Sequence, residues 1–226
     1  MTSGPGKTQL VLKYAMLSYN LKQYSRVFWI SGATVEKLNQ GFAKVLTLVG
    51  HPDRDHPEQS TRLTSARRWL EECNANCSSK WLLVLDNVTQ EAVLFLREHL
   101  PRKNTCGNIL FTTRTQDVAE AVAVVGGEWH HLFELQTPKL DDAVKLLLKE
   151  TATNADNTLS PPTAGAEALV KCVGRLPLAI SYAASFAKQS HLSLENVLSI
   201  YQSKDKYEVC LEFRFPSISI CLWFLG

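Results

Sequence analysis

A short glycine-rich run at the start of the chain contains the first residues whose types and spacing could do chemistry. Residues 1–9 include Gly4, Gly6, Lys7 and Thr8, and the last three match the second half of a phosphate-binding loop, G-x-x-x-x-G-K-[ST]. Backbone N–H groups at the start of the helix that follows such a loop bind phosphate oxygens. We therefore expect Lys7 to reach the β- and γ-phosphates of a nucleotide and the Thr8 hydroxyl to bind Mg²⁺.

This loop is incomplete when it is compared with the full motif. Met1 stands where the motif has its first glycine, and the strand that precedes such a loop is missing. We therefore expect a chain that is truncated at its N-terminus through the loop itself. Taken alone, Gly-Lys-Thr is also compatible with an ordinary surface turn, so the interpretation depends on the residues that follow.

An acidic residue ends the most apolar segment of the chain. Residues 81–86 read WLLVLD, which is typical of a strand buried on both faces of a parallel sheet. Asp86 would hold Mg²⁺, or a water bound to it, at the carboxyl edge of the sheet, where α/β proteins bind ligands. The alternative is a strand that simply ends in a turn-forming Asp-Asn pair. Because the amide of Asn87 cannot take a proton from water as a carboxylate can, we expect slow or absent hydrolysis.

A basic residue ends the next apolar segment. Residues 108–113 read NILFTT and bring Arg114 to the same predicted edge, where a guanidinium can bind a γ-phosphate through two hydrogen bonds. A solvated loop arginine is the alternative. Further along, residues 174–178 (GRLPL) join two predicted helices, and Pro177 stands where a proline favours the start of a helix. A plain helix–helix turn also explains that run.

Short apolar segments alternate with helix-period segments over the first part of the chain. We predict strands at residues 26–31, 81–86 and 108–113, with a shorter fourth candidate at 131–135. We predict helices after the glycine-rich run and over residues 38–49, 62–73 and 90–99. This alternation predicts an α/β fold, namely a three-layer, parallel-sheet P-loop NTPase core with right-handed crossovers and without its first strand.

From about residue 138 the predicted strands stop and the pattern becomes all-helical. Apolar stripes predict helices over residues 140–147, 166–173, 177–187 and, capped by Ser193, up to residue 201. The chain is therefore predicted to contain a nucleotide-binding core (1–137), a small helical subdomain (138–205) and an unassigned apolar tail (206–226). We interpret the tail as a fragment boundary or a faulty gene-model end.

The composition is ordinary for a soluble globular protein and excludes several classes of partner. Apolar residues make up 45% of the chain, and the net charge is +2 with no dense run of Lys and Arg, so we expect no nucleic acid. The longest apolar stretch is shorter than the roughly 20 residues that cross a bilayer, so we expect no membrane. The six cysteines follow no disulfide or zinc pattern, and we expect reduced thiols in the cytoplasm.

These motifs, in this order, resemble the NB-ARC family of STAND-class, signal-transduction P-loop NTPases. Gly6 to Gln9 are similar to the family's phosphate loop, residues 27–30 to its second strand, 82–87 to its acidic strand, 112–114 to its sensor arginine and 174–178 to its Gly-x-Pro motif. The resemblance covers residues 1–205, and the run from Trp81 to Asn87 is similar to the fungal NOD-like receptor branch. It implies that Gly4, Gly6 and Gln9 belong to the nucleotide site, that Pro177 contacts the adenine, and that the later helices form the first ARC subdomain.

Several parts of the family's pattern are missing from this sequence. These are the first strand with its glycine, the winged-helix part with its histidine-containing motif, and the N-terminal effector and C-terminal repeat domains. The resemblance therefore implies that this truncated chain binds nucleotide weakly. It also implies that self-association and effector or repeat domains belong to the full-length protein.

Together these patterns predict a regulatory switch that binds ADP and ATP with Mg²⁺ in an innate-immunity-type signalling protein. Exchange of the two nucleotides, rather than rapid hydrolysis, would change the population of its states. Two alternatives stay open. A true P-loop ATPase or kinase would need a carboxylate base near Asp86 and a lid or an acceptor pocket. A truncated relic or scaffold that binds no nucleotide would explain the damaged loop.

Overall fold

The computed structural model describes residues 6–72, 80–102, 107–124, 131–152 and 164–203. The chain divides into two compact units, Met1–Leu135 and Gln136–Gly226, and each contains its own cluster of buried apolar side chains. Gly4 and the tail predicted at 206–226 lie outside the described residues.

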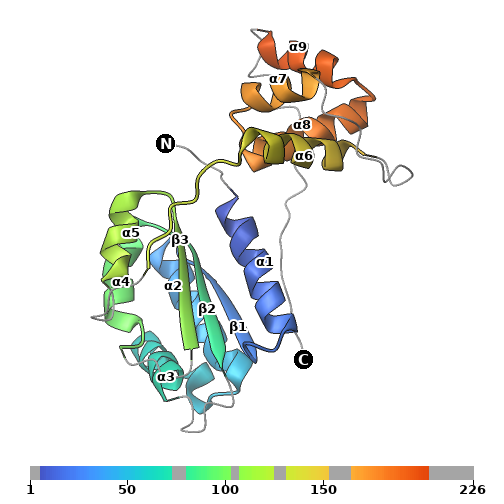
Figure 1. Ribbon diagram of the computed structural model, residues 1–226. Helices are drawn as coiled ribbons and strands as arrows, with labels where there is room; N and C mark the ends of the chain where they lie inside the picture. The colour runs from blue at the N-terminus through green and yellow to red at the C-terminus, as the bar shows by residue number, and fades with distance from the viewer. Residues whose placement is uncertain (1–5, 73–79, 103–106, 125–130, 153–163, 204–226) are drawn as a thin grey trace. The chain divides into compact units, whose positions relative to one another are not determined.

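Three parallel strands form the sheet of the first unit. They are β1 (Arg26–Ser31), β2 (Trp81–Val88) and β3 (Gly107–Thr113), in the order β1-β2-β3 (Figure 1). The middle strand, β2, is buried from its first residue to Leu85 because side chains from helices cover both of its faces. This burial explains its near-continuous apolar sequence.

One face of the sheet is covered by α1 (Lys7–Asn20), which runs beside the strands (Figure 1). Val11 and Ala15 lie on the buried side of this helix and pack against Leu82 and Val84 of β2. Successive strand residues point to opposite faces, so Leu82 and Val84 share the face that α1 covers. The helix is thereby fixed along its length, with its first residue near the carboxyl end of β2.

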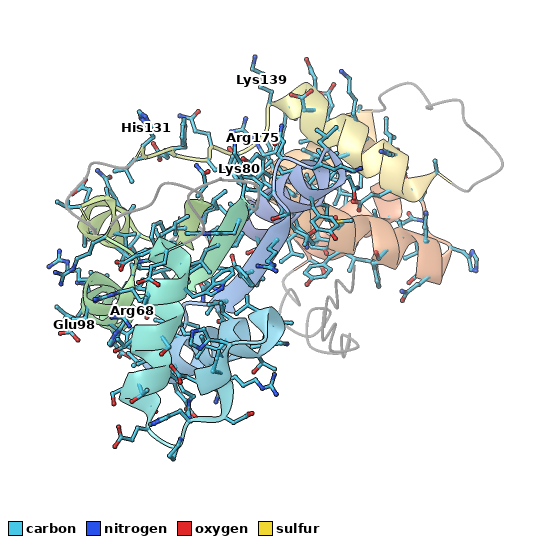
Figure 2. The ribbon with its side chains drawn as sticks, turned by 90° about the horizontal axis from the view of Figure 1, so that it is seen from below. Arg68, Lys80, Glu98, His131, Lys139 and Arg175 are labelled. Atoms are coloured by element: carbon cyan, nitrogen blue, oxygen red, sulfur yellow. The ribbon has the colours of Figure 1, made fainter. Side chains whose placement is uncertain are left out.

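The opposite face carries a larger apolar cluster. Leu83 and Leu85 of β2 pack there with side chains from several helices. These helices are α2 (Val35–Val49), α3 (Gln59–Glu71), α4 (Gln90–His99) and α5 (Gln116–Ala123), and a short 3-10 helix, η1 (Pro52–Asp55), follows α2. Charged side chains such as Arg68 of α3 and Glu98 of α4 point outward from this layer (Figure 2). Helices on both faces of a parallel sheet make the first unit a three-layer α/β core.

The second unit is all-helical within the described residues. It consists of α6 (Leu140–Thr151), α7 (Ala164–Cys172), α8 (Pro177–Ser190) and α9 (Leu194–Gln202). Gly174 and Arg175 both have positive φ angles, 67° and 57°, and they make the turn between α7 and α8. The Ser193 hydroxyl accepts a hydrogen bond from the N–H of Asn196 and so caps α9.

The predicted fold class is confirmed, and the strand ranges differ little from those observed. β1 has the predicted bounds, β2 extends two residues further to Val88, and β3 begins one residue earlier at Gly107. The fourth strand predicted at residues 131–135 is wrong, because this segment forms neither strand nor helix. Its side chains are exposed, including Phe133 at 90%, and an apolar segment becomes a strand only when a neighbouring strand accepts its hydrogen bonds. Helix α5 was not predicted.

Candidate functional site

The glycine-rich run leads directly into the first helix. Gly6 adopts a left-handed conformation (φ 82°, ψ 21°), which glycine reaches without steric cost, and its carbonyl accepts a hydrogen bond of 2.9 Å from the N–H of Leu10. No side chain in the described part of the chain caps this helix end. Backbone N–H groups at a helix start of this kind can bind an anion such as phosphate. Lys7 is half-buried at this end, and Thr8 and Gln9 are exposed.

A hydrogen bond joins the start of α1 to the end of β2. The Thr8 hydroxyl donates to Oδ1 of Asp86 over 3.0 Å, although the two residues are 78 positions apart in the sequence. The structure thus brings together the hydroxyl and the carboxylate that the sequence predicts as Mg²⁺ ligands. Their role in binding the metal stays a prediction.

A third side chain completes this cluster. The hydroxyl of Thr112, on β3, donates to Oδ1 of Asp86 over 2.6 Å and accepts a hydrogen bond of 2.7 Å from the N–H of Asn87. Thr112 is only 6% exposed. Sequence reasoning included this residue only as part of the run that ends in Arg114 and gave it no role of its own. The available signal in the sequence was a hydroxyl residue near the end of the strand predicted to follow the acidic strand, where it could contact Asp86.

The backbone of β2 departs from regular strand geometry at the same place. The register between β2 and β3 shifts between Leu85 and Val88, which is the signature of a bulge. Asn87 lies within the bulge and has a positive φ of 61°, a conformation in which asparagine is several-fold enriched among non-glycine residues. The bulge lets the Asp86 side chain and the Asn87 N–H contact the same threonine hydroxyl.

The segment after β1 supports this edge of the sheet through its backbone. The N–H of Gly32 donates to the carbonyl of Asp86 over 2.7 Å. A Cβ atom at Gly32 would lie 2.8 Å from Cγ2 of Val88, closer than real side chains approach one another. Only glycine therefore allows this segment to lie so near the end of β2. Sequence reasoning did not identify this glycine.

Arg114 and Pro177 are placed by different units. Arg114 follows β3 directly, and because parallel strands end at the same edge of a sheet, it lies at the edge where Asp86 is found; its side chain is exposed. Pro177 is the first residue of α8 in the helical unit, where its fixed φ favours the start of a helix. Its predicted contact with adenine stays a prediction.

The donor set of this cluster fits magnesium bound together with phosphate. Mg²⁺ prefers oxygen ligands and is usually held by one or two carboxylates together with substrate phosphates and water. Thr8 and Asp86 provide one hydroxyl and one carboxylate. Across the described ranges no group of three or more His, Cys, Asp or Glu residues could hold a metal ion by itself. With one hydroxyl and one carboxylate, this pair fits a cation that is held together with the phosphates of a nucleotide.

Fold and site together define the class of protein: the first unit is a nucleotide-binding core of the P-loop NTPase type. Within this class the chain belongs to the NB-ARC domain family, whose family model matches residues 2–157. The predicted resemblance to this family is thus confirmed.

One relative carries the similarity over nearly the whole chain. This chain is 26% identical over 214 residues to a "Nucleotide-binding leucine-rich repeat (NLR)-like protein" of Hyaloscypha variabilis, an alignment that covers 88% of this chain and 20% of the relative. The chain therefore spans about a fifth of the length of that relative. Among the described residues no helix is both long enough and apolar enough to cross a membrane.

Proposed function

We propose that this chain carries an adenine-nucleotide switch that binds and exchanges ADP and ATP with Mg²⁺ and hydrolyses ATP slowly at most. Membership of the NB-ARC domain family supports a nucleotide-binding NTPase module of signalling proteins. The observation that carries the proposal is the hydrogen bond from the Thr8 hydroxyl to the Asp86 carboxylate. It joins the end of the phosphate loop to the acidic strand, as a site for a metal–phosphate complex requires.

The proposed roles follow from position and chemistry. The N–H groups at the start of α1, with Gly6 and Gln9, would bind phosphate oxygens, and Lys7 would bind the β- and γ-phosphates. Thr8 and Asp86 would hold Mg²⁺. Arg114, exposed at the same sheet edge, would contact the γ-phosphate and so distinguish ATP from ADP. Pro177 would contact the adenine. Such a switch works only through a difference in nucleotide affinity between its two states.

Slow turnover is proposed from the residue that follows the metal-side acid. Asn87 offers an amide where a general base would need a carboxylate, and an amide does not take a proton from water. Nucleotide exchange would then change the state of the protein. In a protein that combines this chain with effector or repeat domains, self-association and those domains would read that state. We propose the cytoplasm, where ATP and Mg²⁺ are abundant, as its location.

The proposal is tested by thermal unfolding of the 226-residue chain with ADP or ATP in the presence of Mg²⁺. A nucleotide at about 100 times its Kd stabilises the folded state by about 2.7 kcal/mol, which raises Tm by roughly 5–10 °C. We expect Lys7→Ala to remove this rise. Lys13→Ala, an exposed lysine on the same helix, is the matched control and should keep it. Identical Tm values with and without nucleotide would instead support the alternative of a truncated relic or scaffold that binds no nucleotide.

A true ATPase is the second candidate. The amide of Asn87, in the place where a general base would need a carboxylate, argues against it. Steady-state phosphate release above roughly a few per minute, lost in Lys7→Ala and kept in Lys13→Ala, would favour the enzyme over the switch.

A further inference from the structure

The hydroxyl of Thr112 makes two hydrogen bonds, one as the donor and one as an acceptor. It donates its one proton to Oδ1 of Asp86 and accepts the N–H of Asn87. At 6% exposed, it is shielded from water that would compete for these bonds. The distances, 2.6 and 2.7 Å, are those of strong hydrogen bonds, and the acceptor is a carboxylate, which strengthens the first of them.

This pair of bonds determines how the Asp86 carboxylate is presented. Thr8 and Thr112 both donate to Oδ1, and within the described part of the chain no hydrogen bond ends on Oδ2. Thr8 is exposed at the start of a helix, whereas Thr112 is buried in a strand. Of the two donors, Thr112 is therefore the one that holds the carboxylate when Thr8 turns toward a ligand.

Thr112 also stabilises the backbone that carries this carboxylate. The Asn87 N–H would lack a partner in the β2–β3 ladder because the register shifts at the bulge, and Thr112 accepts it instead. One side chain of β3 thus fixes both the left-handed residue of β2 and the acid before it. Loss of the hydroxyl would leave the partly buried N–H of Asn87 without its acceptor and allow the carboxylate to rotate.

We propose that Thr112 is a positioning residue for the metal-bound nucleotide: it orients Asp86 so that the carboxylate meets Mg²⁺ in one geometry. The proposal rests on the nucleotide-binding function proposed above. Residues that orient a metal ligand by a hydrogen bond typically change metal affinity by about 10–100-fold when they are replaced. Thr112 should therefore affect the magnesium dependence of nucleotide binding more than the nucleotide affinity measured without the metal.

The neighbouring threonine provides a matched control. The Thr113 hydroxyl donates to the carbonyl of Val88 over 2.9 Å and does not reach Asp86. Thr112→Val and Thr113→Val therefore make the same chemical change at adjacent positions of β3. Only the first removes a donor from the carboxylate.

The experiment is a titration of Mg²⁺ into the full chain at fixed ATP, with the ATP-dependent rise in Tm as the readout. We expect Thr112→Val to need at least about tenfold more Mg²⁺ for the half-maximal rise. The shift caused by ATP in EDTA should stay within about twofold of the wild type in Thr112→Val and Thr113→Val. Thr112→Ser, which keeps the hydroxyl, should restore the wild-type magnesium dependence. If Thr112→Val does not fold, Thr112→Cys, with its weak S–H donor, replaces it and should show the same direction of change.

Several results would overturn the inference. One is a wild-type magnesium midpoint in Thr112→Val or its cysteine replacement, and another is an equal shift in Thr113→Val. A third is failure of Thr112→Ser to restore the midpoint. If the wild-type chain itself shows no rise with ATP, the proposed function fails and the inference fails with it. If the wild type responds and the variants match it, the inference alone is wrong.

Discussion

At the scale of single residues, the carboxylate of Asp86 is the point where three elements meet. Thr8 reaches it from the start of α1, Thr112 reaches it from β3, and the bulge at Asn87 turns the backbone of its own strand. The two hydrogen bonds join residues that are far apart in the sequence, and the third feature is a local distortion of β2. The position of the Asp86 carboxylate therefore depends on how α1, β2 and β3 pack at this edge of the sheet.

Asn87 offers a direct test of why turnover should be slow. Asn87→Asp introduces a carboxylate beside Asp86, and aspartate tolerates the left-handed backbone at this position almost as well as asparagine does. A positioned general base typically contributes a factor of about 10²–10⁴ in rate. We expect steady-state phosphate release from ATP to rise at least about tenfold, a lower limit because the base is not otherwise optimised.

The control for this variant is Asn87→Gly, which suits the same backbone and supplies no side chain. It should leave phosphate release at the wild-type level. Equal rates for the aspartate and glycine variants would show that the missing carboxylate is not what limits hydrolysis.

At the scale of elements, the contact between α2 and β1 depends on the absence of a side chain at Gly41. A Cβ atom there would lie 2.3 Å from Cγ2 of Ile30, and Ile30 is only 3% exposed, so it has no room to move. Gly41 therefore lets the helix lie directly on the strand. The same strand pairs with β2 up to its last residue, Ser31, and Gly32 follows with its hydrogen bond to the Asp86 carbonyl.

We predict that Gly41→Ala destabilises the protein although it removes a glycine from a helix. The propensity gain of about 1 kcal/mol is smaller than the roughly 1–3 kcal/mol that overpacking a buried site costs. The expected result is a lower free energy of unfolding in urea. In the background Ile30→Ala, which removes the two closest atoms, Cγ2 and Cγ1, the same change at Gly41 should become neutral or stabilising. A stabilising effect of Gly41→Ala alone would contradict the close contact.

The elements themselves could largely be predicted from the sequence, whereas their contacts could not. The apolar run of β2 indicates a strand with both faces covered, and the observed burial agrees. The role of Thr112 depends on the pairing of β2 with β3 and on a bulge, and neither is encoded in a local pattern. Residues 131–135 illustrate the converse error, in which a local pattern predicts an element that does not form. Their apolar pattern predicted a strand, but a strand also needs a neighbouring strand for its hydrogen bonds.

At the scale of the whole molecule, the two units have separate apolar cores. Leu96 belongs to the core on the helix-rich face of the sheet, and Leu169 belongs to the core formed by α6–α9; both are fully buried. A cavity in one core removes contacts only from the elements that line it. The units should therefore respond separately to core substitutions.

This separation is tested with Leu169→Ala and its counterpart Leu96→Ala. Each substitution should lower the free energy of unfolding of its own unit by about 2–5 kcal/mol. Hydrogen exchange of the full chain should show faster exchange of α6–α9 amides in the first variant and of sheet amides in the second. Loss of protection throughout the chain in both variants would mean that the two units unfold as one.

The left-handed asparagine at the end of β2 has a consequence for how long a signal lasts. In a switch that hydrolyses its nucleotide quickly, the chemical step acts as a clock that ends the signal after a fixed time. With an amide at position 87, under the proposed function, that clock is slowed or stopped. The duration of the active state would then follow the dissociation rate of ATP and the cellular supply of ADP. A cell would end such a signal by exchange of ATP for ADP or by degradation of the protein, and not by hydrolysis of the bound ATP.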